Sequence, residues 1–229
     1  MTGEDPSGFP SPDAPPQAVV LFHAIARTSR SLGKLDRALR QAGFATLNLE
    51  YPSRRKPLDL LAEHVHPAVA DFAGKNQGTL HFVGHSMGGL LARVYVAKHR
   101  PAQLGRVVML GTPNGGSEVA DLLQGLSLYR KFYGPAGLQL TTHLDGVLRS
   151  LPALDYAVGI IAGNSSIDPI SSILVLPRPN DGRVSVESSR LIGMADHITV
   201  KASHSGLLRH RVAIDQTIAF LREGRFKPL

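Results

Sequence analysis

Short apolar runs rich in β-branched residues alternate along the chain with longer segments in which apolar residues recur every three or four positions. The short runs predict buried strands, and the longer segments predict amphipathic helices. This alternation is typical of an α/β fold, in which a mainly parallel sheet carries helices on both faces. The six expected strands are Ala18–Phe22, Ala45–Leu49, Thr79–Val83, Arg106–Leu110, Ala157–Ala162 and Ile198–Lys201.

Four helices are expected between and after these strands. One begins near Leu32 and stops at Gly43, where a glycine provides a natural helix end. The second follows an apolar stripe over Leu58–Phe72, and Pro67 inside it predicts a kink because its ring removes one backbone donor. The other two are expected over Gly88–His99 and Leu207–Arg222.

Two parts of the chain depart from this alternation. Residues 1–17 are rich in proline and are expected to form a flexible tail. The interval from Thr112 to Asp155 contains no expected strand, so it forms an insertion. Its apolar residues fit two interpretations, ordinary core and a mobile apolar cover over a site. We therefore expect one domain over residues 18–229 with an insertion at about 112–155.

Composition supports a single folded domain. A length of 229 residues fits one large α/β domain, and 43% hydrophobic with 19% charged residues excludes a disordered or fibrous chain. No run approaches the roughly 18 apolar residues that a membrane span needs. The tail lacks the basic and apolar regions of a secretory signal, so we expect a cytoplasmic protein.

Charge and cofactor motifs narrow the function further. The formal net charge is +7, but the basic residues are scattered and no nucleic-acid-binding pattern accompanies them, so no nucleic-acid partner is expected. Contact with a membrane or lipid interface stays open. Cysteine is absent, which excludes disulfides and thiol nucleophiles. His64 and His66 point to different faces of a helix, so no metal is expected, and no dinucleotide or P-loop motif predicts a cofactor.

The strongest chemical motif is the G-x-S-x-G pattern of Gly84–Gly88, with Ser86 at its centre. It lies between an expected strand and an expected helix. A turn of this kind holds the serine in a strained conformation that projects its hydroxyl, and the glycines avoid collisions with neighbouring elements. Ser86 is therefore a candidate nucleophile. A glycine-rich turn at this place also fits simple phosphate binding.

A serine hydroxyl needs a histidine base, which in turn needs an orienting carboxylate. Such groups belong in loops at the carboxyl ends of parallel strands. His204 meets this condition because it follows the last expected strand, whereas its rival His197 lies at the beginning of that strand. Asp181 occupies the Asn-Asp-Gly turn before it. Asp155 and Asp168 are the alternative acids, and a turn role alone also fits Asp181.

Acyl transfer also requires N–H donors aimed at the developing oxyanion. The backbone N–H of Met87, directly after the nucleophile, is one expected donor. The loop after the first strand is expected to supply the other from Ile25, with Ala24 adjacent.

Four segments together resemble bacterial lipases and esterases of the α/β-hydrolase superfamily. The segments are Val20–Thr28, Gly84–Gly89, Gly111–Pro113 and Asn180–Ser185. The resemblance implies a nucleophile at Ser86, an acid at Asp181 and a base at His204, with oxyanion donors at Met87 and Ile25. It also implies that the insertion is a lid or cap. One departure is Ala24, where the family's H-G motif usually has glycine.

These residues predict an esterase or lipase that cleaves carboxylic esters through an acyl-Ser86 intermediate. The apolar residues of the insertion favour a small-molecule ester with an acyl chain. Two alternatives stay open. The same intermediate fits an acyltransferase, and the departure at Ala24 together with the positive charge fits a non-catalytic ligand-binding protein.

Overall fold

The computed structural model describes residues 16–116, 134–137, 139, 148–166 and 176–229. Its centre is a six-stranded sheet in the order β2-β1-β3-β4-β5-β6, with every pair parallel. All six expected strands are present, and the predicted α/β class is confirmed. The strands are β1 Ala18–Phe22, β2 Ala45–Leu49, β3 Leu80–His85, β4 Leu104–Leu110, β5 Val158–Gly163 and β6 Asp196–Val200.

The third strand ends later than predicted because its pairing with the neighbouring strand continues. The predicted third strand stopped at Val83, but β3 runs on because Gly84 pairs with Met109 and His85 pairs with Leu110. Pairing with a neighbouring strand overrides the weak strand propensity of glycine. The sheet therefore extends to the residue immediately before Ser86.

The expected helices are present with altered ends. They are α1 Gly33–Gln41, α2 Leu58–Lys75, α3 Met87–His99 and α8 Arg211–Glu223. The predicted helix over Leu207–Arg222 is wrong at its start, because the extended backbone of His210 separates a 3-10 turn from α8. A further helix, α7 Val186–Ser189, is too short for hydrophobic periodicity to reveal, and Ser185 caps it by accepting from Ser188 N–H.

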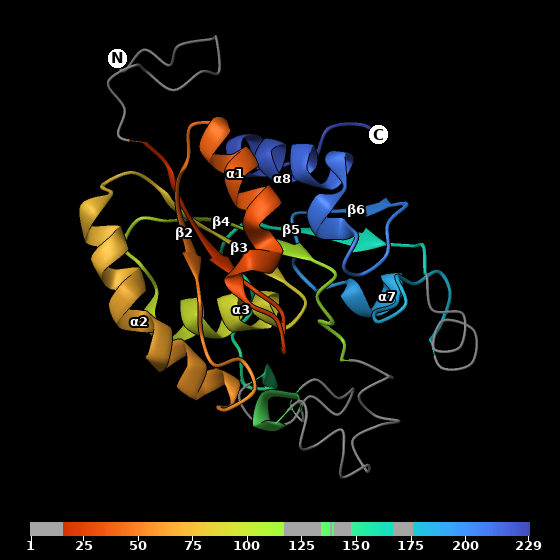
Figure 1. Cartoon of the computed structure of the whole chain (residues 1–229), viewed down its shortest axis with the longest axis horizontal. Coiled ribbons are helices and arrows are strands. Elements are labelled where there is room, and N and C mark those ends of the chain that lie inside the picture. Colours follow the sequence, from red (N-terminus) through yellow and green to blue (C-terminus); the bar gives the residue numbers. More distant parts are fainter. Residues whose placement is uncertain (1–15, 117–133, 138, 140–147, 167–175) are drawn as a thin grey trace.

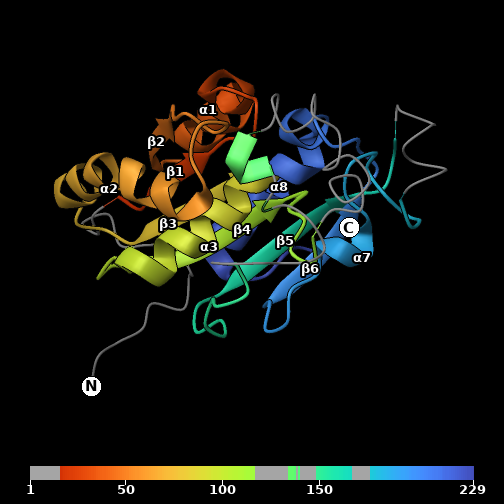
Figure 2. The ribbon, with the colours of Figure 1, turned by 90° about the horizontal axis from the view of Figure 1, so that it is seen from below.

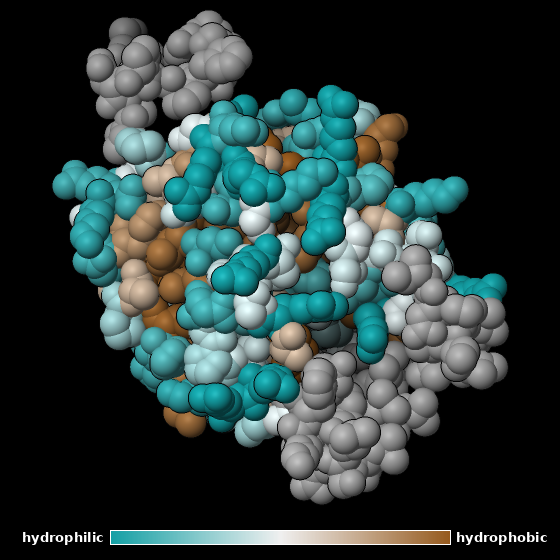
Figure 3. Space-filling view, in the orientation of Figure 1, coloured by the Kyte–Doolittle hydropathy of each residue, from teal (hydrophilic) through white to brown (hydrophobic). Residues whose placement is uncertain are grey.

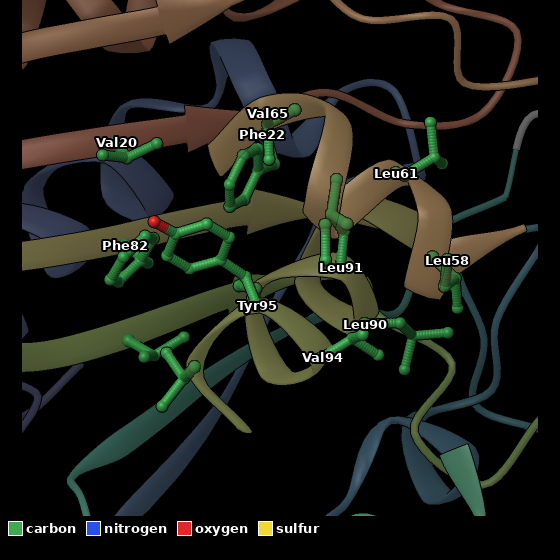
Figure 4. Close-up of a cluster of buried hydrophobic side chains, with 14 of the residues drawn as sticks. Val20, Phe22, Leu58, Leu61, Val65, Phe82, Leu90, Leu91, Val94 and Tyr95 are labelled. Carbon is green, nitrogen blue, oxygen red and sulfur yellow. The ribbon is translucent and has the colours of Figure 1, made fainter. Parts of the chain in front are cut away.

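Helices cover the sheet on both faces. Helices α2 and α3 lie on one face, and α1 and α8 lie on the other (Figures 1 and 2). Because successive strand side chains point to opposite faces, Val20 and Phe22 enter the α2–α3 core, whereas Val19 and Leu21 enter the α1–α8 core. Figure 4 shows Phe22 beside Phe82 and Tyr95 in the first core. Figure 3 shows that the face over α1 and α8 is mostly hydrophilic.

Described parts of the insertion contribute to the core. Ala136 and Leu148 are buried in the α2–α3 core, and the Gln139 side chain accepts a hydrogen bond from Leu58 N–H at 2.8 Å. These residues fit the core interpretation. The lid prediction falls largely on 117–133 and 140–147, which lie outside the described residues.

Of the predicted flexible tail, residues 1–15 likewise lie outside the described residues. Gln17, directly before β1, extends the pairing with β2, since its carbonyl accepts from Ala45 N–H at 3.0 Å. Within the described ranges, no helix has both the length and the apolar character that crossing a bilayer requires.

The strand order creates one position where a site is favoured. From β1 the chain moves to β2 on one side and then returns to β3 on the other side of β1. Loops that leave β1 and β3 are therefore expected to diverge at the carboxyl ends of these strands, where α/β sheets bind ligands. The segment after β1 begins at His23, and the turn after β3 contains Ser86.

Candidate active site

Ser86 occupies a sharp turn between β3 and α3. Its backbone has φ 55° and ψ −124°, a conformation that costs a non-glycine residue about 1–3 kcal/mol. Its N–H donates to Leu110 O on the neighbouring strand at 2.9 Å, which holds the turn in place. The strand, the strained serine and the helix follow one another as the G-x-S-x-G pattern predicts.

Glycines allow this turn to pack tightly. A Cβ on Gly84 would lie 2.4 Å from the backbone of Gly88, and a Cβ on Gly88 would lie 2.2 Å from Phe22 O. Any side chain at either position would therefore collide with backbone atoms. Thr112, two residues beyond the end of β4, adds a further restraint by donating a hydrogen bond from its hydroxyl to Ser86 O at 3.0 Å.

Asp181 and His204 form a hydrogen-bonded pair. Nδ1 of His204 lies 2.8 Å from Oδ2 of Asp181, while Oδ1 accepts from the N–H groups of Arg183 and Val184 at 2.9 and 2.8 Å. The backbone N–H of His204 also donates to Asp181 O at 3.0 Å. Since a carboxylate only accepts, Nδ1 carries the proton and Nε2 keeps a free lone pair. The pair is oriented for a base at Nε2.

One glycine lies between this pair and the serine turn. Gly111 has φ +56°, and a Cβ there would lie 3.1 Å from Asp181 Oδ2 and 3.2 Å from His204 Nδ1. The preceding residue, Leu110, accepts the hydrogen bond from Ser86 N–H. Ser86, Asp181 and His204 are thus brought to the same edge of the sheet. Within the described residues, no hydrogen bond joins the Ser86 hydroxyl to the His204 ring, whose Nδ1 contacts Asp181.

His85 holds the backbone of the loop that carries His204. Its Nε2 lies 3.0 Å from His204 O, and the two rings are 4.7 Å apart at 43°. Burial, followed by the charge of His204, holds the pKa of His85 well below its ordinary value, so the neutral ring donates to this carbonyl. This contact joins two distant parts of the chain, so no local pattern in the sequence indicates it.

The rival residues have other partners. Nε2 of His197 lies 3.0 Å from the Ser189 hydroxyl. Asp155 is exposed and pairs with Arg100 at 2.8 Å. The third alternative, Asp168, lies outside the described residues. Among the described candidates, the structure joins Asp181 with His204.

The predicted oxyanion donors lie in two adjacent segments. Met87 is the first residue of α3, so its N–H has no acceptor within the helix. Ile25 lies in a turn closed by the hydrogen bond from Arg27 N–H to Ala24 O at 3.2 Å. Neither the Met87 nor the Ile25 N–H donates to the backbone of another described residue. Both groups are therefore free of backbone partners in the segments that follow β3 and β1.

The histidines considered for metal binding have protein partners. Nδ1 of His66 lies 3.1 Å from the Tyr95 hydroxyl, and Nδ1 of His64 lies 3.4 Å from Lys56 Nζ. Across the ranges that the structure describes, no cluster of three or more histidine, aspartate or glutamate side chains is arranged to hold a metal ion.

Comparison with a protein-family model decides the family. The model of the alpha/beta hydrolase fold matches residues 17–144. The chain belongs to the α/β-hydrolase fold family. The region matched contains the strand, serine turn and helix described above, and this α/β hydrolase carries its Asp181–His204 pair beyond that region.

Solved structures share the architecture of this α/β hydrolase. The mature lipase BlEst2 from Bacillus licheniformis is 20% identical with a TM-score of 0.70, over 95% of this chain and 96% of that one. The metagenomic carboxyl esterase MGS0156 is 21% identical with a TM-score of 0.68, over 89% and 70%. The RedJ thioesterase of prodiginine biosynthesis in Streptomyces coelicolor is 16% identical with a TM-score of 0.60, over 98% and 91%. Identities this low establish a shared fold.

Proposed function

We propose that this α/β hydrolase cleaves carboxylic esters through a covalent acyl-Ser86 intermediate. The observation that carries the proposal is the Asp181–His204 pair, which lies beside Gly111. Gly111 directly follows Leu110, whose carbonyl accepts the hydrogen bond from Ser86 N–H. The solved lipase and carboxyl esterase of the same fold support this reaction class. A phosphate-binding turn alone would not require a carboxylate–histidine pair beside it.

In the first half of the reaction, Ser86 Oγ attacks the ester carbonyl carbon while His204 Nε2 takes the hydroxyl proton. The carbonyl oxygen becomes an oxyanion, which the N–H groups of Met87 and Ile25 stabilise. The C–O bond to the alcohol then breaks, and the protonated His204 gives its proton to the departing oxygen. Asp181 stabilises the imidazolium and keeps its Nδ1–H oriented.

In the second half, water replaces the alcohol. His204 Nε2 removes a proton from water as the water oxygen attacks the acyl carbon, and a second oxyanion forms at the same donors. Collapse of this intermediate breaks the bond to Ser86 Oγ, which recovers its proton from His204. The carboxylic acid leaves, and the enzyme returns to its starting state.

Ser86→Ala tests this mechanism with a panel of p-nitrophenyl esters. We expect kcat/KM to fall by about 10⁴-fold or more, because the nucleophile is lost while folding is retained. Ser31→Ala, which changes a half-buried serine of the first 3-10 turn, is the matched control and should keep full activity. Turnover by Ser86→Ala equal to that of the wild type would contradict the proposal.

The proposed substrate is a small ester with an acyl chain. The apolar residues in the sequence of the insertion are the reason for this choice, because an insertion that covered the site would favour an apolar acyl group. We expect kcat/KM to rise from acetate to octanoate esters. A steep preference for acetate would contradict the choice of substrate without contradicting the role of Ser86.

A further inference from the structure

The loop after β1 is held by a second loop, which follows β2. The hydroxyl of Tyr51 donates a hydrogen bond to His23 O. The rings of these two residues also stack, with centroids 4.0 Å apart and planes at 13°. Tyr51 therefore fixes both the carbonyl and the side chain at the beginning of the first loop.

A second contact holds the other end of that loop. The Ser53 hydroxyl accepts from Ala26 N–H at 3.2 Å. Ala26 has a positive φ of 55°, a region that residues other than glycine rarely occupy because Cβ approaches the backbone. The hydrogen bond to the Ser53 hydroxyl thus stabilises the strained backbone conformation of Ala26.

The two contacts belong to one rigid unit. Ser53 N–H donates to Tyr51 O at 2.8 Å, so the two holding residues are fixed to each other. Both are buried, at 4% and 5% exposure, and burial raises the pKa of Tyr51 well above its ordinary value. The phenol consequently keeps its proton and remains a donor at neutral pH.

Between these two fixed points lie Ala24 and Ile25. Their segment carries the proposed oxyanion donor, whose N–H makes no backbone hydrogen bond with the described residues. A donor that stabilises an oxyanion must be aimed before the charge forms, because reorienting it during the reaction costs part of the stabilisation. Residues that hold this segment in place would therefore increase the reaction rate without contacting the substrate.

We propose that Tyr51 and Ser53 are positioning residues that hold the Ala24–Ile25 segment with its N–H directed at the oxyanion. This role rests on the proposed function. It gives the loop after β2 a role in catalysis. Neither the proposed triad nor the family match identifies this role. It also offers a reason why alanine is accepted at position 24, because the segment is held by outside contacts rather than by the freedom of a glycine.

Kinetics of Tyr51→Phe and Ser53→Ala test the catalytic part. For each variant we expect kcat to fall by about tenfold with KM changed less than twofold, since one oxyanion donor accounts for about 10²- to 10³-fold and would be misdirected rather than lost. The inhibition constant of a trifluoromethyl ketone, which forms an oxyanion on attack by serine, should rise by the same factor. A fall in activity caused only by misfolding would instead lower the active fraction and leave that inhibition constant unchanged.

Tyr95→Phe is the matched control. It removes another buried tyrosine hydroxyl from the same core, one that contacts His66 rather than the loop after β1. We expect this variant to keep the kcat of the wild type. Wild-type kcat and inhibition constants in both Tyr51→Phe and Ser53→Ala would overturn the proposal, even where the wild type shows Ser86-dependent turnover.

Hydrogen–deuterium exchange tests the physical part independently of activity. In the double variant Tyr51→Phe/Ser53→Ala we expect the hydrogen-bonded amides of this segment, those of Ala26 and Arg27, to exchange about tenfold faster than in the wild type, with the exchange of β3 unchanged. Equal exchange of these amides would overturn the proposal whatever reaction the protein catalyses. Loss of Ser86-dependent hydrolysis in the wild type, by contrast, would count against the proposed function.

Discussion

At the scale of the residue, Asp181 determines which nitrogen of His204 carries a proton. Two backbone N–H groups occupy Oδ1, so Oδ2 is the oxygen that faces His204 Nδ1. An asparagine in the same position would keep its oxygen on the two N–H groups and turn its NH₂ toward His204. Nδ1 would then have to accept a hydrogen bond, so the ring proton would lie on Nε2. Nε2 could then no longer act as the base.

We therefore predict that Asp181→Asn lowers kcat by about 10³- to 10⁴-fold at neutral pH, the order expected when a triad aspartate is lost. The melting temperature should change little because the side-chain shape is kept. Asp155→Asn is the matched control, since it removes a carboxylate that pairs with Arg100 at the surface. The prediction would fail if Asp181→Asn and Asp155→Asn had the same ester turnover.

The pairing of Asp181 with His204 was predictable from the sequence, because both residues lie in loops at the carboxyl ends of strands. The backbone geometry that supports it was not. Gly111 appeared only as part of a Gly-Thr-Pro segment, and its closeness to the Asp181–His204 pair depends on the register of β4 and β5. Contacts between residues far apart in the chain leave no local pattern.

At the scale of the element, the serine turn depends on how closely α3 approaches β1. That approach is set by Gly88, because a Cβ there would lie 2.2 Å from Phe22 O and 2.8 Å from His23 O. Both obstacles are backbone atoms of a buried strand end and cannot move aside. The start of α3, and with it Ser86, would have to shift.

We predict that Gly88→Ala lowers the free energy of unfolding by about 2–3 kcal/mol, as overpacking of a core does, and lowers kcat together with it. Gly74→Ala is the matched control. Gly74 lies exposed within α2 with nothing within 4 Å of its added Cβ, so alanine should stabilise the protein by about 0.5–1 kcal/mol. Urea unfolding measures both changes. Equal stability of the two variants would contradict the packing argument.

Elements themselves were predicted well where a periodic pattern is long enough. Helix α2 and the buried strand β1 have clear apolar patterns, and both lie where the sequence placed them. Helix α7 and the break at His210 were missed, because four residues carry no period and an extended residue within an apolar stripe leaves the stripe intact.

At the scale of the whole molecule, three histidines of the described ranges are buried in the fold in uncharged form. Burial lowers the pKa of His23, of His85 and of His81, and the charge of Arg106 adds to the effect at His81. The pKa of His81 falls from 6.5 to about 4. Below pH 6.5 the unfolded chain therefore binds more protons than the folded one, and stability rises with pH over this window.

We predict that His81 alone lowers the free energy of unfolding by about 3 kcal/mol as the pH falls from 7 to 4, with the other two adding to the loss. His81→Asn should reduce the fall by about that amount. Asparagine keeps an acceptor for Arg106 N–H, which His81 Nδ1 holds at 2.9 Å, but does not titrate. Urea unfolding across this pH range is the measurement. A variant with the full pH dependence of the wild type would contradict the assignment.

The central claim is that Ser86 is an activated nucleophile, and covalent labelling tests it most directly. A fluorophosphonate probe reacts with a serine only where a base removes its proton and donors stabilise the developing charge. We predict a single phosphonyl adduct, located by mass spectrometry on the peptide that contains Ser86, and greatly slowed labelling in Asp181→Asn. Folded wild-type protein that gains no adduct, or gains it on another residue, would contradict the account.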